Sequence, residues 1–377
     1  MVLLDYLKWR NDVSLDISPF NDIDNVILSC LAYIDFGEFF ANSDESYTLE
    51  EIFELFCKNH SLDEIRESKQ FTERVALLLE EMVQADRFKG TKVVHYAEDL
   101  DKEKVKQFAA VTFILPDGTN YVSFRGTDST ITGWKEDFLM AFMADTEGAK
   151  AAVKYLNEVS KLLEGELIVG GHSKGGNFAM FASAFCDKVV QDRISRVYNN
   201  DGPGFRDEVI ESTGYKEILP KICTIVPQTS MIGQLLDNES EQRVIESDAI
   251  GLYQHDAMTW KVTKDKFVES ELDAFGNFVD VALGSWLEKI DDETRLSIVS
   301  TVFSMIEETE AETFYEFSDS LFKNTGIIIK GLVKLPKEKR AELMTALSSL
   351  IKVSSRTAFS KIPKPAERLR IEKKNNL

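Results

Sequence analysis

The pentapeptide Gly171-His-Ser-Lys-Gly175 restricts the fold of this chain more than any other feature of its sequence. The apolar run Leu167-Ile-Val169 precedes it, and small residues follow it at helical spacing. A Gly-x-Ser-x-Gly between a buried strand and a helix is typical of a strained turn with the serine at its apex. Side chains at Gly171 or Gly175 would collide with the neighbouring strand and helix, and the helix N-terminus favours negative charge beside the serine. The pattern predicts Ser173 as a nucleophile rather than an incidental serine in a glycine-rich turn.

The segments around this turn alternate between strand and helix patterns. Residues 92–124 predict strands, with a hairpin at Pro116-Asp-Gly-Thr119, and residues 149–163 predict a helix with one apolar face. Further strands are expected at 194–198, 222–226 and 243–245. Alternation of strand, helix and strand favours an α/β fold, with a mostly parallel sheet covered by helices.

Helical periodicity dominates both ends of the chain. We expect a helical N-terminal segment over residues 1–90, an α/β core over 91–262 and a helical C-terminal region over 263–377. The last region ends in a basic tail at 361–377, which is expected to fray or to make weak contact with a membrane surface. The terminal helices either form a lid over a pocket or pack on the core.

Composition excludes several classes of function. The chain has 44 basic and 64 acidic residues, a net charge of −20, which disfavours nucleic acid as a partner. It has no HExxH, paired His or Cys, or phosphate-binding glycine motif, so neither a metal nor another cofactor is expected. No apolar run reaches the length of about 18 residues that a membrane span needs. Scattered cysteines and an N-terminus without a signal-peptide core favour a cytoplasmic protein.

Three segments together resemble the class 3 (fungal-type) lipases: Phe124-Arg-Gly-Thr127, Gly133-Trp-Lys-Glu-Asp-Phe138 and Gly171-His-Ser-Lys-Gly-Gly176. Two more, Asn200-Asp-Gly-Pro-Gly-Phe205 and Gln254-His-Asp256, make the chain more similar still to a bacterial lipase-like family of unknown function. The resemblance extends over about residues 90 to 262. It implies an α/β-hydrolase fold and hydrolysis of an ester.

The resemblance also implies how an oxyanion would be held. The residue after Arg-Gly, here Thr127, and the residue after the nucleophile, here Lys174, would each donate a backbone N–H. Such donors are worth about 3 kcal/mol each in other hydrolases. For the neighbouring Arg125 and Asp137 we expect a structural role, as a buried ion pair that ties the loop to the following helix.

The general base is chosen from only four histidines. His172 adjoins the nucleophile, so its side chain is expected to point elsewhere. His60 and His95 precede Ser173, whereas this fold places the histidine last in chain order. His255, in a loop after the last predicted strand, is therefore the predicted base.

The acid of the triad is less clear from the sequence. Class 3 lipases carry an aspartate shortly before a Val-Pro pair, but no carboxylate stands directly before Val226-Pro227 here. Asp201, in a glycine-rich turn after the strand that follows Ser173, is slightly favoured, although an Asx-turn would also explain it. Asp237 is the alternative acid. Asp256 is adjacent to His255 in sequence and is poorly placed to reach its Nδ1.

These residues together predict a serine esterase with a lipid or other carboxylic ester as substrate. His255 would deprotonate Ser173, which would attack the ester carbonyl and form an acyl-enzyme. The missing aspartate leaves a non-catalytic binding or regulatory module as the alternative function. A membrane-surface phospholipase recruited by the tail at 361–377 is a third hypothesis.

Overall fold

The computed structural model describes residues 1–41, 45–101, 103, 105–128, 135–137, 145–273 and, further on, 297, 300, 301, 303, 304, 337, 340 and 341. The predicted helices after residue 273 and the basic tail at 361–377 therefore lie outside the described residues, apart from those isolated positions.

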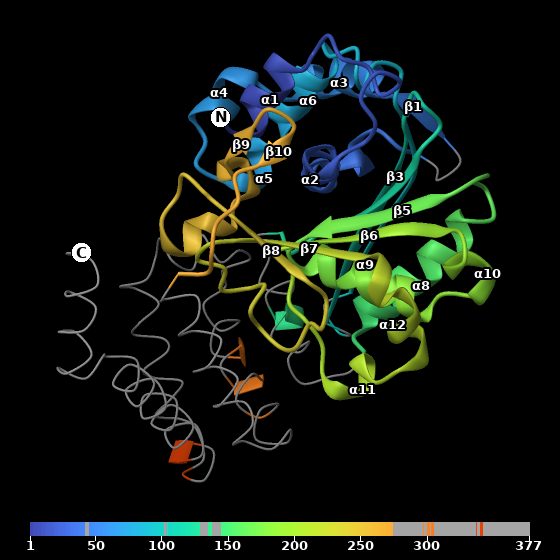
Figure 1. The fold of residues 1–377 in the computed structure, drawn as a ribbon, viewed down its shortest axis with the longest axis vertical. Coiled ribbons are helices and arrows are strands. Elements are labelled where there is room, and N and C mark those ends of the chain that lie inside the picture. The colour runs from blue at the N-terminus through green and yellow to red at the C-terminus, as the bar shows by residue number, and fades with distance from the viewer. Residues whose placement is uncertain are drawn as a thin grey trace, which may run out of the picture.

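An eight-stranded sheet forms the centre of the described structure (Figure 1). Its strands lie side by side in their order along the chain. Pairing is antiparallel from β1 to β4 and parallel from β4 to β8. The strands are β1 (Ser46–Thr48), β2 (Lys92–Asp101), β3 (Lys106–Ile114), β4 (Asn120–Phe124), β5 (Leu167–His172), β6 (Ile194–Asn200), β7 (Ile222–Pro227) and β8 (Gln242–Ile245). The sheet and its flanking helices confirm the predicted α/β-hydrolase-like fold.

Three helices connect the parallel strands and cover one face of the sheet (Figure 1). They are α8 (Glu147–Val159) between β4 and β5, α9 (Lys174–Phe185) between β5 and β6, and α12 (Thr213–Ile218) between β6 and β7. Their apolar side chains pack with alternate residues of the strands, among them Phe124, Val169 and Val197. Three short helices also lie in this region: α10 (Lys188–Gln191), α11 (Asp207–Ile210) and the 3₁₀ helix η2 (Leu219–Lys221).

The N-terminal helices cover the opposite face of the sheet (Figure 1). Val111, Phe113 and Tyr121 pack against these helices and are 0% exposed. They alternate along their strands with the residues that face α8, α9 and α12. The helices are α1 (Leu3–Trp9), α2 (Asp22–Leu31), η1 (Phe36–Glu38), α3 (Leu49–Asn59), α4 (Leu62–Glu67), α5 (Phe71–Arg74) and α6 (Ala76–Met82). Together these helices form one layer that packs on the central sheet.

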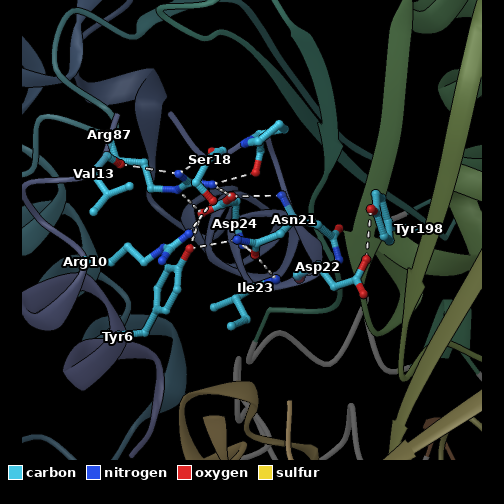
Figure 2. A network of polar contacts seen from close by, with 12 residues as sticks. Tyr6, Arg10, Val13, Ser18, Asn21, Asp22, Ile23, Asp24, Arg87 and Tyr198 are labelled. Atoms are coloured by element: carbon cyan, nitrogen blue, oxygen red, sulfur yellow. Dashed lines mark hydrogen bonds and ion pairs between the residues drawn. The ribbon is translucent and has the colours of Figure 1, made fainter. Parts of the chain in front are cut away.

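A buried ion pair anchors α2 in this layer (Figure 2). Asp24 on α2 is 0% exposed and accepts hydrogen bonds from Tyr6 Oη at 3.0 Å and from Arg87 Nε at 2.8 Å. The remaining guanidinium nitrogens of Arg87 donate to backbone carbonyls of the loop before α2, including Ser18 at 2.7 Å. Because both charges have several partners, the pair can remain buried without an unsatisfied group.

The structure differs from the sequence expectations in two places. The helical segment before residue 90 also contains the short strand β1, which extends the sheet beyond β2. Residues after Trp260, where helices were expected, form a small hairpin of β9 (Val262–Thr263) and β10 (Lys266–Phe267). Phe267 packs there against the ring of Trp260 with 6.0 Å between centroids, so its apolar character reflects this contact and not a helix face.

Candidate active site

Ser173 lies at the apex of a sharp turn between β5 and α9. Its backbone angles, φ 58° and ψ −133°, lie in a region that non-glycine residues rarely adopt and that costs about 1–3 kcal/mol. The two glycines of the motif permit this turn. A Cβ on Gly171 would lie 2.3 Å from the carbonyl carbon of Gly175, and one on Gly175 would lie 2.1 Å from the backbone oxygen of Phe124. The sequence therefore folds locally as the Gly-x-Ser-x-Gly pattern predicted.

Asp201 follows β6, the strand next to β5 in the sheet. Its side chain is 1% exposed, and its backbone φ of 53° turns the chain away from the strand direction. One carboxylate oxygen, Oδ1, accepts hydrogen bonds from Ser230 Oγ and from the backbone N–H of Gly233 at 3.2 Å. These donors fix the carboxylate and leave Oδ2 for another partner.

His255 ends the 3₁₀ helix η3 (Gly251–His255), which follows β8. Its Nδ1 lies 2.6 Å from Asp201 Oδ2, and its Nε2 lies 2.9 Å from Ser173 Oγ. An ionised carboxylate can only accept, so Nδ1 carries the proton and Nε2 accepts from the serine hydroxyl. A neutral imidazole in this tautomer can take the serine proton.

The structure thus brings together the predicted nucleophile, the predicted base and the favoured acid, in the chain order Ser, Asp, His. Exposed Asp237 lies elsewhere: its backbone pairs with that of Phe205. Asp256, next to the base, forms an ion pair with Arg74 at 3.0 Å.

The loop after β4 lies against the serine turn. Because β4 and β5 are parallel, with Phe124 opposite Gly171, residues 125–127 leave the same edge of the sheet as Ser173. A Cβ on Gly126 would lie 2.5 Å from the backbone oxygen of His172. Lys174 begins α9, so its N–H is one of the first-turn amides that a helix leaves without an internal partner.

The side chain of Thr127 is hydrogen-bonded to Asp137. Its hydroxyl donates to the Asp137 carboxylate, with Oγ1 2.6 Å from Oδ1. Burial raises the pKa of Asp137 to about 6, against the opposing effect of the Lys174 ammonium. The expected ion pair between Arg125 and Asp137 was wrong, because Arg125 instead pairs with Glu98 on β2. That strand lies close enough to meet the guanidinium, which the sequence did not reveal.

The buried side chain of Lys174 is a feature that the sequence reasoning missed. The side chain is 1% exposed, and its Nζ lies 2.6 Å from Gln107 Oε1 and 3.1 Å from Glu136 Oε2. Glu136, itself 0% exposed, also accepts from the backbone N–H groups of Gln107 and Gly148. These bonds tie the residue after the nucleophile to the start of β3 and of α8. The charged residue directly after Ser173, at the start of a predicted apolar helix, was the available signal in the sequence.

Two other features, a metal-ion cluster and a membrane-spanning helix, are absent from the described part of the chain. No group of three or more His, Cys, Asp or Glu side chains there is placed to hold a metal ion. Nor do the described helices include one that is both long and apolar enough to span a membrane.

Comparison with known proteins gives a matching family and similar solved structures, one of which is a lipase. The family model described as Mbeg1-like matches residues 82–304, more than half of the 377-residue chain and a range that contains Ser173, Asp201 and His255. The crystal structure of M37 lipase is 14% identical, with a TM-score of 0.33, and the match covers 53% of this chain and 79% of that chain. No curated protein matches the chain.

Proposed function

Since this chain belongs to the Mbeg1-like family and carries a hydrogen-bonded Ser, His and Asp, we propose that it is a serine hydrolase that cleaves carboxylic esters. One observation carries the proposal. Ser173 Oγ lies 2.9 Å from His255 Nε2, and the opposite ring nitrogen lies 2.6 Å from Asp201. These distances are within the range for proton transfer between a nucleophile, its base and the group that orients the base.

The proposed reaction begins when His255 Nε2 takes the hydroxyl proton of Ser173, whose oxygen attacks the ester carbonyl. The tetrahedral intermediate collapses as the imidazolium returns the proton to the leaving alcohol, and an acyl-enzyme remains. Water, deprotonated by the same histidine, then attacks the acyl carbon; the bond to Ser173 Oγ breaks, the imidazolium returns its proton to that oxygen, and the free acid leaves. Buried Asp201 stabilises the imidazolium in both halves of the reaction, because it faces Nδ1–H as an acceptor.

In this proposal the backbone N–H groups of Thr127 and Lys174 hold the oxyanion, as the likeness to class 3 lipases suggests. Two contacts favour it. The hydroxyl of Thr127 donates to Asp137, and this bond restrains the loop that carries the Thr127 N–H. Lys174 is restrained by its own side chain, bonded to Gln107 and Glu136. Fixed donors stabilise a developing charge more than donors that must reorganise.

An apolar acyl or alcohol group is the substrate feature that the site favours. Ile250 and Tyr253, 85% and 81% exposed, lie on or next to the short helix that ends in His255. Apolar side chains this exposed, on the segment that carries the proposed base, offer contact area to an apolar substrate. Recruitment to a lipid surface by residues 361–377 falls outside the described residues.

The non-catalytic alternative loses its main ground. It depended on the missing carboxylate before Val226-Pro227, whereas Asp201 Oδ2 faces the base at 2.6 Å from another strand end. This contact supports the proposed hydrolase over a non-catalytic binding module.

The test is labelling with a fluorophosphonate probe, followed by intact-mass measurement. We expect one adduct on the wild-type protein and none on Ser173→Ala, because only an activated serine attacks the probe. Ser195→Ala, a change at an exposed serine on β6, is the matched control and should label as the wild type does. A wild-type protein that is folded by circular dichroism but carries no adduct would refute the proposal.

A further inference from the structure

His172, the residue before the nucleophile, is buried between the serine turn and the segment that carries His255. Its side chain is 1% exposed and its ring centroid lies 4.7 Å from that of His255. The rings of Phe71, at 5.2 Å, and Trp260, at 6.1 Å, pack on other sides. A buried imidazole needs partners for both ring nitrogens, since an unsatisfied polar group here is costly.

Both ring nitrogens have a hydrogen-bond partner, and the partners determine which nitrogen carries the hydrogen. Nε2 lies 2.8 Å from the backbone oxygen of His255, and Nδ1 lies 3.0 Å from Tyr33 Oη. A carbonyl oxygen only accepts, so Nε2 carries the hydrogen and Nδ1 accepts from the tyrosine hydroxyl. Burial and the neighbouring His255 lower the pKa of His172 well below its usual value, in agreement with a neutral ring.

The bond to the carbonyl of His255 acts on the residue that would serve as base. That residue ends a short 3₁₀ helix whose preceding positions include highly exposed Ile250 and Tyr253. The backbone oxygen of Gln254, the residue before the base, accepts from Trp260 Nε1 at 2.8 Å, and the backbone oxygen of His255 accepts from His172. The imidazole of His255 is held by Asp201, and its main chain by His172.

Tyr33 extends the same arrangement to the loop after β4. A Cβ on Gly126 would lie 2.0 Å from Tyr33 Oη and 2.5 Å from the backbone oxygen of His172. Tyr33 follows α2, and its hydroxyl is buried against the serine turn. The pair Tyr33–His172 therefore touches the backbone of both loops that flank Ser173.

We propose that His172, oriented by Tyr33, is a positioning residue that holds the His255 backbone so that its imidazole stays between Ser173 and Asp201. The proposal rests on the serine-hydrolase function proposed above. It gives the N-terminal layer a part in the reaction, because Tyr33 comes from that layer. A displacement of about 1 Å in a reacting group can cost about a hundredfold in rate.

The first test compares His172→Leu with His172→Gln. Leucine fills space but cannot donate to the His255 carbonyl, whereas the amide of glutamine can. We expect His172→Leu to lower kcat for ester hydrolysis about tenfold to a hundredfold with little change in KM, and His172→Gln to restore most of the loss. Tyr33→Phe, which removes only the hydroxyl, should give an intermediate loss. Equal losses in the leucine and glutamine variants, or no loss in either, would overturn the positioning role.

The second test does not depend on turnover. The chain has four histidines, so ¹⁵N-histidine labelling gives a spectrum simple enough to assign, with the signal missing from His172→Gln identifying this residue. We expect a neutral Nε2–H tautomer at pH 7.5. A protonated ring or an Nδ1–H tautomer would refute the proposal even if the enzyme is active. If fluorophosphonate labelling fails but the tautomer is as expected, the proposed function is at fault and not the contact.

Discussion

At the scale of single residues, the site depends on two backbone angles that the chain would otherwise avoid. Ser173 and Asp201 both have positive φ, at 58° and 53°. Each residue nevertheless continues the sheet by one bond: Ser173 N–H donates to Asn200 O at 2.9 Å, and Asp201 N–H to Ile225 O at 2.8 Å. The sheet thus holds both backbones in place while the chain turns, which carries the side chains over its edge, where they meet His255.

The identity of the acid gives a prediction at this scale. Asp201→Asn should lower kcat by about three to four orders of magnitude, because an amide cannot stabilise the imidazolium and favours the wrong tautomer. Asp237→Asn is the matched control, since this exposed side chain should tolerate the change within about twofold. Steady-state hydrolysis of a p-nitrophenyl ester measures both. Loss of activity in Asp237→Asn with Asp201→Asn intact would instead identify Asp237 as the acid.

The residues that the sequence could predict are those whose role follows from local pattern or chain order. Gly171 and Gly175 revealed the serine turn, and order along the chain selected His255. The sequence left the identity of the acid open between Asp201 and Asp237, because the distance from each carboxylate to the base depends on where separate strands end. The side-chain partners of Lys174 and His172 are far away in sequence, Glu136 and Tyr33, so no local pattern revealed them.

At the scale of elements, α2 shows how a helix is fixed against a sheet by more than apolar contact. Its N-cap Asn21 accepts hydrogen bonds from the backbone N–H groups of Ile23 and Asp24 and so begins the helix. Further along, Asn25 bonds through its side chain to Asn200, the residue before Asp201, at 2.9 Å. Asn200 Nδ2 also donates to the backbone oxygen of Gly171. The helix is therefore joined directly to the strand ends that carry the site.

The ion pair shown in Figure 2 gives the prediction for this element. Arg87→Met leaves the Asp24 carboxylate buried without its counter-charge and should lower the free energy of unfolding by about 3–5 kcal/mol. Arg66→Met removes a comparable but half-exposed cation, paired with Asp63 and Glu80, and should cost less than about 1 kcal/mol. Urea unfolding followed by circular dichroism measures both. Similar small losses in the two variants would contradict a tightly buried pair.

The sequence predicted elements best where periodicity and flanking residues agree. The strands β5 to β7 and the helix α8 were found within a few residues, since each is apolar in the expected period. The hairpin at 262–267 was missed because each strand is only two residues long, and its turn includes Lys264 with φ 55° instead of a glycine. Short strands have too few positions to show a period of two.

At the scale of the whole molecule, the strand order explains why one face of the sheet is covered by the N-terminal helices. Strands β4 to β8 advance across the sheet in one direction, and parallel crossovers are right-handed. Successive crossovers of this kind place α8, α9 and α12 on the same face. The other face would be left uncovered without α1 to α6. This topology favours core packing over a lid for the helices before residue 90, a choice that periodicity alone left open.

Removing residues 1–89 tests that argument. The change would expose a sheet face that includes Val111, Phe113, Tyr121, Tyr198 and Ile225, none more than 4% exposed. At about 1.5–3 kcal/mol for each such side chain, the loss is on the order of 10 kcal/mol, comparable to the whole stability of a typical domain of about 5–15 kcal/mol. We expect the shortened chain not to unfold cooperatively and not to react with a fluorophosphonate.

Co-expression of residues 1–89 as a separate chain is the control for this deletion. It should restore soluble, reactive protein, because the missing layer supplies both the apolar cover and Tyr33, whose hydroxyl contacts His172. A shortened chain that folds cooperatively and labels as fast as the full chain would mean that the sheet tolerates an open face. In that case the N-terminal helices would be a lid, and labelling by bulky probes should become faster when they are removed.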